Sequence, residues 1–232
     1  MLEDLRKDVK KASNPEKARQ FQRFFKTGKG EYAFGDVFVG LTVPQSRALA
    51  KKYLALSLKE AEALLKSKIH EERLIALLIL STRFVKGDES ERAKIHKLYL
   101  KNTKFVNNWD LVDTSAEYIV GMYCYEHGST LLTKLARSKS LWERRIAMIA
   151  TFYFIKQGES KETLKIAKLL LKDDHDLIHK AAGWMLREMG KRVSEKDLRK
   201  FLDQYASQMP RTMLRYALEK LPPQDRQYYM KL

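Results

Sequence analysis

Residues able to bind anions or stack on rings recur at nearly equal intervals along the chain. Arg73, Trp109, Arg145 and Lys180 are separated by 36, 36 and 35 residues. One helical turn later stand Leu77, Asp113, Ile149 and Trp184, followed by Arg187. If a structural unit repeats at this interval, we expect these positions to align on one concave surface, where cations and indoles suit a phosphate backbone with its bases or sugars. Tryptophans packed in the core beneath a solvated basic rim are the alternative.

A carboxylate on such a surface needs an explanation, because it repels the phosphates that the cations attract. Asp113 lies one helical turn after Trp109. One interpretation is an ion pair that neutralises Arg145. The other is a cationic ligand: an N-alkylated purine attracts an indole face, and its departure leaves an oxocarbenium-like sugar that a carboxylate stabilises. The residues alone leave both interpretations open.

Helices are expected to position these residues. The 232 residues include only 10 Gly and 5 Pro, and the stretches between them repeat apolar residues at three- and four-residue spacing, which predicts an all-α fold. A repeat of this length with two helices, the aligned residue early in the longer one, is typical of an α-solenoid. No linker rich in Pro, Gly or Ser divides the chain, so we expect a single domain over residues 1–232.

One region interrupts the helical pattern. Four of the ten glycines fall between Gly28 and Val43, among aromatic and β-branched residues. This composition predicts one short glycine-rich loop or β-hairpin near the N-terminus.

The charge balance indicates a polyanionic partner. The chain has 45 Lys and Arg against 29 Asp and Glu, a net charge of +16, which favours nucleic acid or an anionic membrane surface. The cations are spread along the chain and not gathered on one amphipathic helix, which favours nucleic acid. The longest apolar run, Leu74 to Leu80, is too short to cross a bilayer, and the N-terminus lacks a secretory pattern, so we expect a cytosolic protein. The single cysteine, Cys124, is interpreted as core packing.

The sequence contains no strong motif for binding a metal ion or a nucleotide. His175 and His179 lie four residues apart beside several aspartates, but the zinc-peptidase glutamate and a distant ligand are missing. We expect no metal, and we interpret the aspartates as helix N-terminal residues and His179 as a polar contact to DNA. The glycine spacing fits neither a Walker loop nor a dinucleotide motif, so no cofactor is expected.

Three segments carry a more specific pattern. They read FVNNWDLVD at 105–113, LWERR at 141–145 with TFYFI at 151–155, and KAAGWMLRE at 180–188. Together and in this order they resemble the AlkD family of bacterial DNA alkylation repair proteins, over nearly the whole chain. The resemblance implies HEAT-like repeats around double-stranded DNA and a monofunctional glycosylase that releases 3-alkyladenine and 7-alkylguanine without turning the base into a pocket. It implies no cofactor.

The resemblance also implies roles for single residues. Trp109 and Trp184 match the two tryptophans beside the lesion, and Asp113 matches the catalytic carboxylate. Residues matched to positions at or near the DNA backbone are Arg145, Lys180 and Arg187. We expect Arg73 to contact DNA as well, from its place in the repeat. Nothing in the sequence requires more than a monomer.

Residues 24–38 depart from the active enzymes of that family. The segment is longer and richer in glycine, and Phe24 or Phe25 stands where those enzymes place a tyrosine, so Phe24 is expected to contact DNA. It resembles relatives without glycosylase activity. An ordinary surface loop is one interpretation; a loop across the groove that favours branched or distorted DNA is another. A non-catalytic DNA binder and a protein-binding scaffold therefore stay open. A groove that tracks phosphates must lose DNA affinity steeply as salt rises, and weak or absent DNA binding at low salt would exclude both DNA functions.

Overall fold

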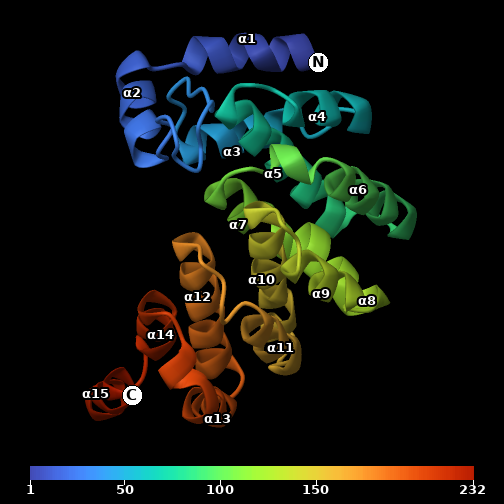
Figure 1. The fold of residues 1–232 in the computed structure, drawn as a ribbon. Coiled ribbons are helices and arrows are strands. Elements are labelled where there is room, and N and C mark those ends of the chain that lie inside the picture. Colours follow the sequence, from blue (N-terminus) through green and yellow to red (C-terminus); the bar gives the residue numbers. More distant parts are fainter. The chain divides into compact units, whose positions relative to one another are not determined.

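The computed structural model describes residues 1–232, and its regular secondary structure is entirely helical (Figure 1). The all-α prediction is confirmed. Contacts within the chain divide it into two compact units, residues 1–115 and 116–232. No helix is long and apolar enough to span a bilayer.

The first unit is built around one central helix. Its elements are α1 (Leu2–Ala12), α2 (Pro15–Phe24), α3 (Val43–Lys52), α4 (Leu58–Leu65), α5 (His70–Lys86), α6 (Glu89–Lys101), the 3₁₀ turn η1 (Thr103–Phe105) and α7 (Trp109–Ala116), whose last residue belongs to the second unit. Helix α5 packs against α3, α4 and α6, and α1 packs on α3. It is apolar on most sides, and residues such as Leu77, Leu80 and Phe84 are fully buried, each contributing roughly 1.5–3 kcal/mol.

Side chains that the sequence marks as caps begin two of these helices. The Asn14 side chain accepts the Lys17 N–H at 3.0 Å, and Pro15 occupies the first turn of α2. The Ser57 hydroxyl accepts the Glu60 N–H at 3.2 Å, while the Glu60 carboxylate accepts the Ser57 N–H at 2.9 Å. These bonds satisfy N–H groups that the first helical turn leaves unpaired.

The glycine-rich segment between α2 and α3 is a loop and not a β-hairpin. Its only bridge is an isolated parallel pair between Val37 and Ile69. Gly40 has a φ of +86°, and a Cβ there would lie 2.1 Å from the Asn14 carbonyl oxygen. Glycine is therefore required where the loop passes against the start of α2.

The second unit has two layers of helices. Its elements are the π-helical turn η2 (Glu117–Met122), α8 (Tyr123–His127), α9 (Thr130–Ala136), α10 (Leu141–Lys156), α11 (Lys161–Leu169), α12 (Asp176–Arg192), α13 (Glu195–Tyr205), η3 (Ala206–Gln208), α14 (Arg211–Leu218) and α15 (Pro223–Lys231). In the long-helix layer, η2, α10, α12 and α14 pack side by side; in the short-helix layer, α9 and α11 touch each other, and α9, α11 and α13 cover α10 and α12 (Figure 1).

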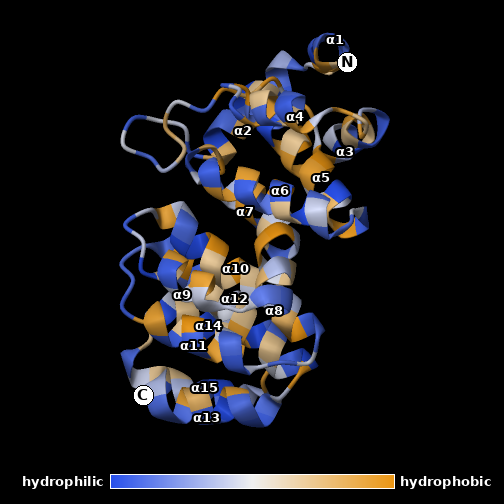
Figure 2. Cartoon of the chain, turned by 90° about the vertical axis from the view of Figure 1, so that its right-hand side faces the viewer, coloured by the Kyte–Doolittle hydropathy of each residue, from blue (hydrophilic) through white to orange (hydrophobic).

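Apolar faces and small residues hold these layers together (Figure 2). A Cβ on Gly183 of α12 would lie 2.4 Å from the Met213 carbonyl oxygen of α14, so glycine permits the close approach of the two helices. Cys124 is buried, as predicted, and burial raises the pKa of its thiol to about 12. This thiol stays protonated and serves packing.

The predicted repeat of helices is present in the chain order. Arg73, Arg145 and Lys180 lie near the starts of α5, α10 and α12, and Trp109 is the first residue of α7. The helices α4, α9 and α11 that precede α5, α10 and α12 are each shorter, and α7 continues helically through η2 and α8. The interval at which these residues recur in the sequence therefore corresponds to one pair of helices.

Candidate nucleic-acid interface

The first unit fixes Trp109 in an aromatic cluster. Its indole stacks on Phe25, with centroids 5.1 Å apart and planes inclined by 17°. The Phe24 ring meets the same indole edge-on at 5.9 Å, and Phe24 is 64% exposed. Phe25 thus supports the indole, whereas Phe24 presents a phenyl ring to solvent, as expected of a residue that contacts a ligand.

The stack continues inward to a buried histidine. Phe25 stacks on Phe38 at 4.9 Å, and Phe38 stacks on the His70 imidazole at 4.4 Å. His70 is the first residue of α5 and is almost wholly buried. A continuous path of ring contacts therefore joins Trp109 to the start of α5.

Two carboxylates hold the His70 ring. Nδ1 lies 3.1 Å from the Asp36 carboxylate, and Nε2 lies 2.8 Å from the Asp110 carboxylate. Arg73 lies 2.7 Å from the other oxygen of Asp36 and donates to the Ser67 carbonyl oxygen at 3.0 Å. We define Asp36, His70, Arg73 and Asp110 as the buried charge network. It joins the glycine-rich loop, α5 and α7.

The network favours the charged forms of His70 and Asp36. Burial opposes the charge on His70, but Asp110 and Asp36 outweigh it and raise the pKa of the imidazole. Burial also opposes ionisation of Asp36, but the hydrogen bond from His70 and the charge of Arg73 outweigh it and lower the pKa of that carboxyl. In the imidazolium form both ring nitrogens donate, which matches two carboxylate acceptors.

Glu71 gives the glycine-rich loop a second anchor. Its buried carboxylate accepts the backbone N–H groups of Val39, Gly40 and Leu41 at 2.8 to 3.2 Å. Together with the charge network, this bond set fixes the loop against the start of α5. The loop is therefore held to the first unit by specific hydrogen bonds and ion pairs.

Arg73 does not lie where the repeat placed it. Its side chain is 4% exposed and bonded within the charge network. Leu77, one turn later, is fully buried. These bonds keep the Arg73 guanidinium away from solvent and hold the glycine-rich loop against α5. A contact between Arg73 and DNA stays a prediction.

Asp113 lies on α7 one turn after Trp109 and is partly exposed. Its charge acts with burial to raise the pKa of the Tyr99 hydroxyl in the same unit. The first unit therefore carries a partly exposed carboxylate one helical turn from an indole that Phe25 supports.

In the second unit, the predicted residues of α12 form one stripe. Lys180, Trp184 and Arg187 recur at four- and three-residue spacing and avoid the buried face of the helix. Trp184 meets Phe152 of α10 at 6.1 Å. Residues at this spacing share a helix face, so we define these three as the α12 stripe.

Carboxylates already contact both cations of the α12 stripe. Lys180 pairs with Asp176 at 2.7 Å and is 42% exposed. Arg187 bonds Glu188 at 3.0 Å and also Glu219. These acids raise the pKa of Arg187, although burial opposes it. A phosphate would share or replace such partners.

Arg145 and His179 make internal bonds as well. Arg145 is buried and donates to the Leu177 carbonyl oxygen, and Ile149 one turn later is also buried. His179 bonds the Asp173 carbonyl oxygen through Nε2. The expectation that all members of the repeat align on one open surface is therefore wrong; their DNA contacts stay predictions.

The histidines and aspartates at the start of α12 have structural partners. His175 accepts the Leu177 N–H through Nδ1 at 3.1 Å, and Asp173 bonds Arg144 at 2.5 Å. Burial lowers the pKa of His175. No group of three His, Cys, Asp or Glu side chains is arranged to hold a metal ion.

Sequence reasoning missed Asp36, His70, Glu71 and Asp110. Asp36, the neighbours His70 and Glu71, and Asp110 come from three distant parts of the chain, and no repeat or motif connects the three parts. The one local signal is the run His70-Glu71-Glu72-Arg73 at the start of an apolar helix, where four polar residues precede a core segment.

These features define an all-helical protein that carries cationic and aromatic side chains on single helix faces. The sequence model of the DNA alkylation repair enzyme family matches residues 5–221, and the chain belongs to this family. Membership indicates a role in DNA repair and interaction with DNA.

A solved structure supports the fold assignment. The predicted DNA alkylation repair enzyme from Enterococcus faecalis matches with a TM-score of 0.70 and 18% identity, over 91% of this chain and 97% of that chain. At this identity the likeness concerns the fold alone. A search of curated proteins finds no match.

Proposed function

We propose that the protein is a monofunctional DNA glycosylase that hydrolyses the N-glycosidic bond of cationic alkylpurines in double-stranded DNA. The observation that carries this proposal is the position of Asp113, a partly exposed carboxylate one helical turn from an indole that Phe25 holds in place. A cationic base and a sugar cation are the groups that such a pair stabilises.

The reaction follows from the charge on the substrate. The bond between the sugar C1′ and the base nitrogen breaks, and its electron pair leaves with the base, which becomes neutral. Water adds to the oxocarbenium-like C1′ and loses a proton. Asp113 stabilises the sugar cation, Trp109 interacts with the cationic base, and Trp184 is proposed as a second aromatic contact on the family resemblance. No metal or organic cofactor takes part.

DNA binding is proposed to use two cations of the second unit and, separately, an aromatic side chain of the first. Lys180 and Arg187 of the α12 stripe are the first candidates because they share an accessible helix face. Phe24 is a further candidate because its ring is exposed beside Trp109. Counterion release by such contacts makes DNA affinity fall steeply with salt.

The test is release of free base from a duplex that contains 7-methylguanine. We expect the wild type to release the base and Asp113→Asn to lose most of this activity at matched occupancy of the DNA. Asp4→Asn is the matched control, since it makes the same change at an exposed carboxylate of α1. Base release by Asp113→Asn at the wild-type rate would contradict the assignment.

The anchored glycine-rich loop favours a second candidate function, a non-catalytic binder of branched or distorted DNA. The loop fixed by Glu71 and the charge network carries exposed Phe34, and the end of α2 that precedes it carries exposed Phe24; exposed rings on an anchored segment suit recognition of DNA shape. Tight, salt-sensitive binding of a four-way junction without release of 7-methylguanine or 3-methyladenine would select this function.

A further inference from the structure

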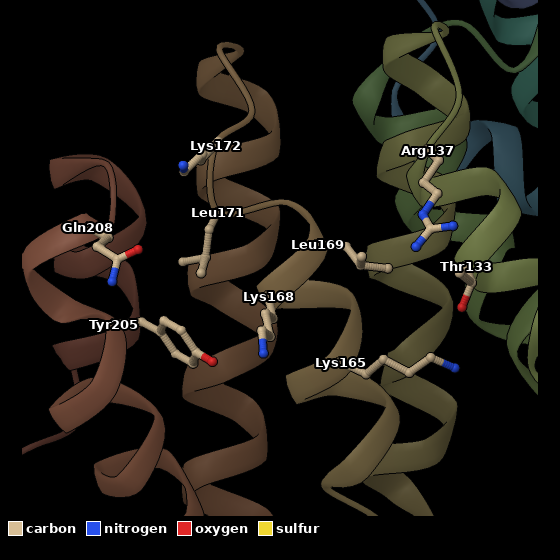
Figure 3. Close-up of a pocket in the computed structure, with 9 residues that line it drawn as sticks. All are labelled: Thr133, Arg137, Lys165, Lys168, Leu169, Leu171, Lys172, Tyr205 and Gln208. Atoms are coloured by element: carbon tan, nitrogen blue, oxygen red, sulfur yellow. The ribbon is translucent and has the colours of Figure 1, made fainter.

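The short-helix layer carries a hollow that none of the residues discussed above line. Its volume is about 570 Å³, and four cations face it: Arg137, Lys165, Lys168 and Lys172 (Figure 3). They come from α11 and from the turns that end α9 and α11, and Tyr205 at the end of α13 completes one wall. No carboxylate lines this hollow, so it is a positively charged concavity.

The cations of this hollow have few partners within the protein. Arg137 and Lys172 form no ion pair, and Lys168 lies with its Nζ 5.5 Å from the centre of the Tyr205 ring. Lys165 alone meets a carboxylate, Glu162 of the same helix, at 3.2 Å. The lysine and the arginine of the α12 stripe, in contrast, both contact acids.

The spacing of the lysines disfavours a purely structural explanation. Lys165 and Lys168 lie three residues apart on α11, opposite its buried face formed by Thr163, Ile166 and Ala167, and Lys172 follows four residues later in the turn after the helix. Like charges at these intervals destabilise a helix by about 0.2–0.5 kcal/mol per pair. An anionic ligand would turn this repulsion into attraction.

The positive surface is longer than one phosphate. A neighbouring hollow of about 280 Å³ shares Lys165, Lys168 and Tyr205 and adds Lys200 of α13. Asp197 lines it too, but its carboxylate accepts the Ser160 hydroxyl at 2.8 Å. Cations spread over three successive helices suit a polymer with repeated charges, and the Tyr205 ring offers a face for a sugar or base.

We propose that the short-helix face binds the phosphate backbone of a second DNA segment, separate from the segment assigned to the α12 stripe. The two surfaces belong to different layers of the same unit. One chain would then hold two duplexes or two arms of a branched DNA. This surface acts on undamaged backbone, so it does not depend on base release.

The experiment counts duplexes bound by the full-length protein. We expect native mass spectrometry with an undamaged duplex of about 10 base pairs, one helical turn, to detect two duplexes per wild-type chain. Arg137→Gln/Lys168→Gln/Lys172→Gln should bind one. The control Lys196→Gln/Arg226→Gln/Lys231→Gln removes the same charge from exposed positions outside both hollows and should bind two.

Three results would overturn the proposal. They are one duplex on the wild type, equal stoichiometry for the hollow variant and its control, and displacement of the second duplex by poly-glutamate at concentrations where excess duplex fails to displace it. The last result would assign the face to acidic protein segments. Loss of the second duplex in the hollow variant alone supports the proposal even if no base is ever released.

Discussion

The start of α5 in the first unit and the α12 stripe in the second use the same kinds of residue in opposite ways. Arg73 is 4% exposed and bonded to Asp36 and a backbone carbonyl. Lys180, at the equivalent place in the repeat, is 42% exposed and pairs with one acid on its own helix. The repeat interval in the sequence therefore locates each pair of helices. It does not show whether the cation at that position is buried in an internal ion pair or exposed to solvent.

Burial explains this difference. A cation withdrawn from water needs fixed partners, and the glycine-rich loop supplies them to Arg73 through Asp36. No such loop covers α12, so its cations keep contact with solvent. In the first unit the charges build the structure that holds Trp109, whereas the cations of the α12 stripe stay partly exposed, and we propose that they meet DNA.

The largest expected effect is a difference in folding stability between a variant at the start of α5 and a variant in the α12 stripe. Arg73→Ala leaves the buried Asp36 carboxylate with His70 as its remaining ion-pair partner and should lower the free energy of unfolding by up to about 3–5 kcal/mol. Lys180→Ala removes an exposed pair and should change it by less than about 0.5 kcal/mol. Chemical denaturation followed by circular dichroism measures both. Equal stabilities of the two variants would remove the contrast.

The charge network also predicts a pH dependence that the α12 stripe lacks. Because the pKa of His70 is raised in the folded state, its stabilising contribution is complete below the unfolded value near 6.5 and is lost as pH rises through the folded pKa. We expect urea stability to decline over that range in the wild type and not in His70→Gln. His127→Gln, at an exposed histidine of α8, should keep the wild-type profile.

An NMR titration tests the raised pKa of His70 independently of stability. The His70 ring signals should change above pH 6.5, because its pKa is raised in the folded protein. A His70 titration below pH 6.5 would mean that burial outweighs the two carboxylates, and the network would then hold a neutral ring.

Much of the fold follows from local pattern. The all-α fold and the repeat of helix pairs depend on residues close in sequence, and both predictions are confirmed. For residues 28–43 the sequence predicts either a glycine-rich loop or a β-hairpin. A glycine-rich composition indicates a turn, but it does not show which residues elsewhere in the chain the segment bonds to. Its anchor is Glu71, about 30 residues away.

The site was less predictable for the same reason. Trp184 and Lys180 could be grouped because they share one helix face. The charge network joins Asp36, His70 and Asp110 across 74 residues, and no periodicity reports such contacts. Arg73 was assigned from its place in the repeat, and only its burial reveals that its charge is already used.

The two tryptophans extend the comparison to aromatic residues. Trp109 stacks on Phe25, so Trp109→Ala should lower the free energy of unfolding by about 0.5–1.5 kcal/mol from lost ring contacts. Trp184 has one tilted ring neighbour, so Trp184→Ala should mainly weaken DNA binding, by about 1–3 kcal/mol if it stacks on a base. Fluorescence anisotropy and denaturation measure these effects; a larger stability loss at Trp184 would reverse the assignment.

The smallest expected effect compares two lysines with the same exposure and the same ion-pair spacing. Lys66 and Lys180 are each 42% exposed and each pair with an acid four residues earlier, at 2.6 and 2.7 Å. If only the α12 stripe meets the DNA backbone, Lys180→Gln should reduce the slope of log K against log salt by about one, whereas Lys66→Gln should leave it unchanged. Both variants lose the same charge, so a difference in net charge does not explain the result. Equal slopes would mean that Lys180 acts through the general positive field of the protein and not through a phosphate contact.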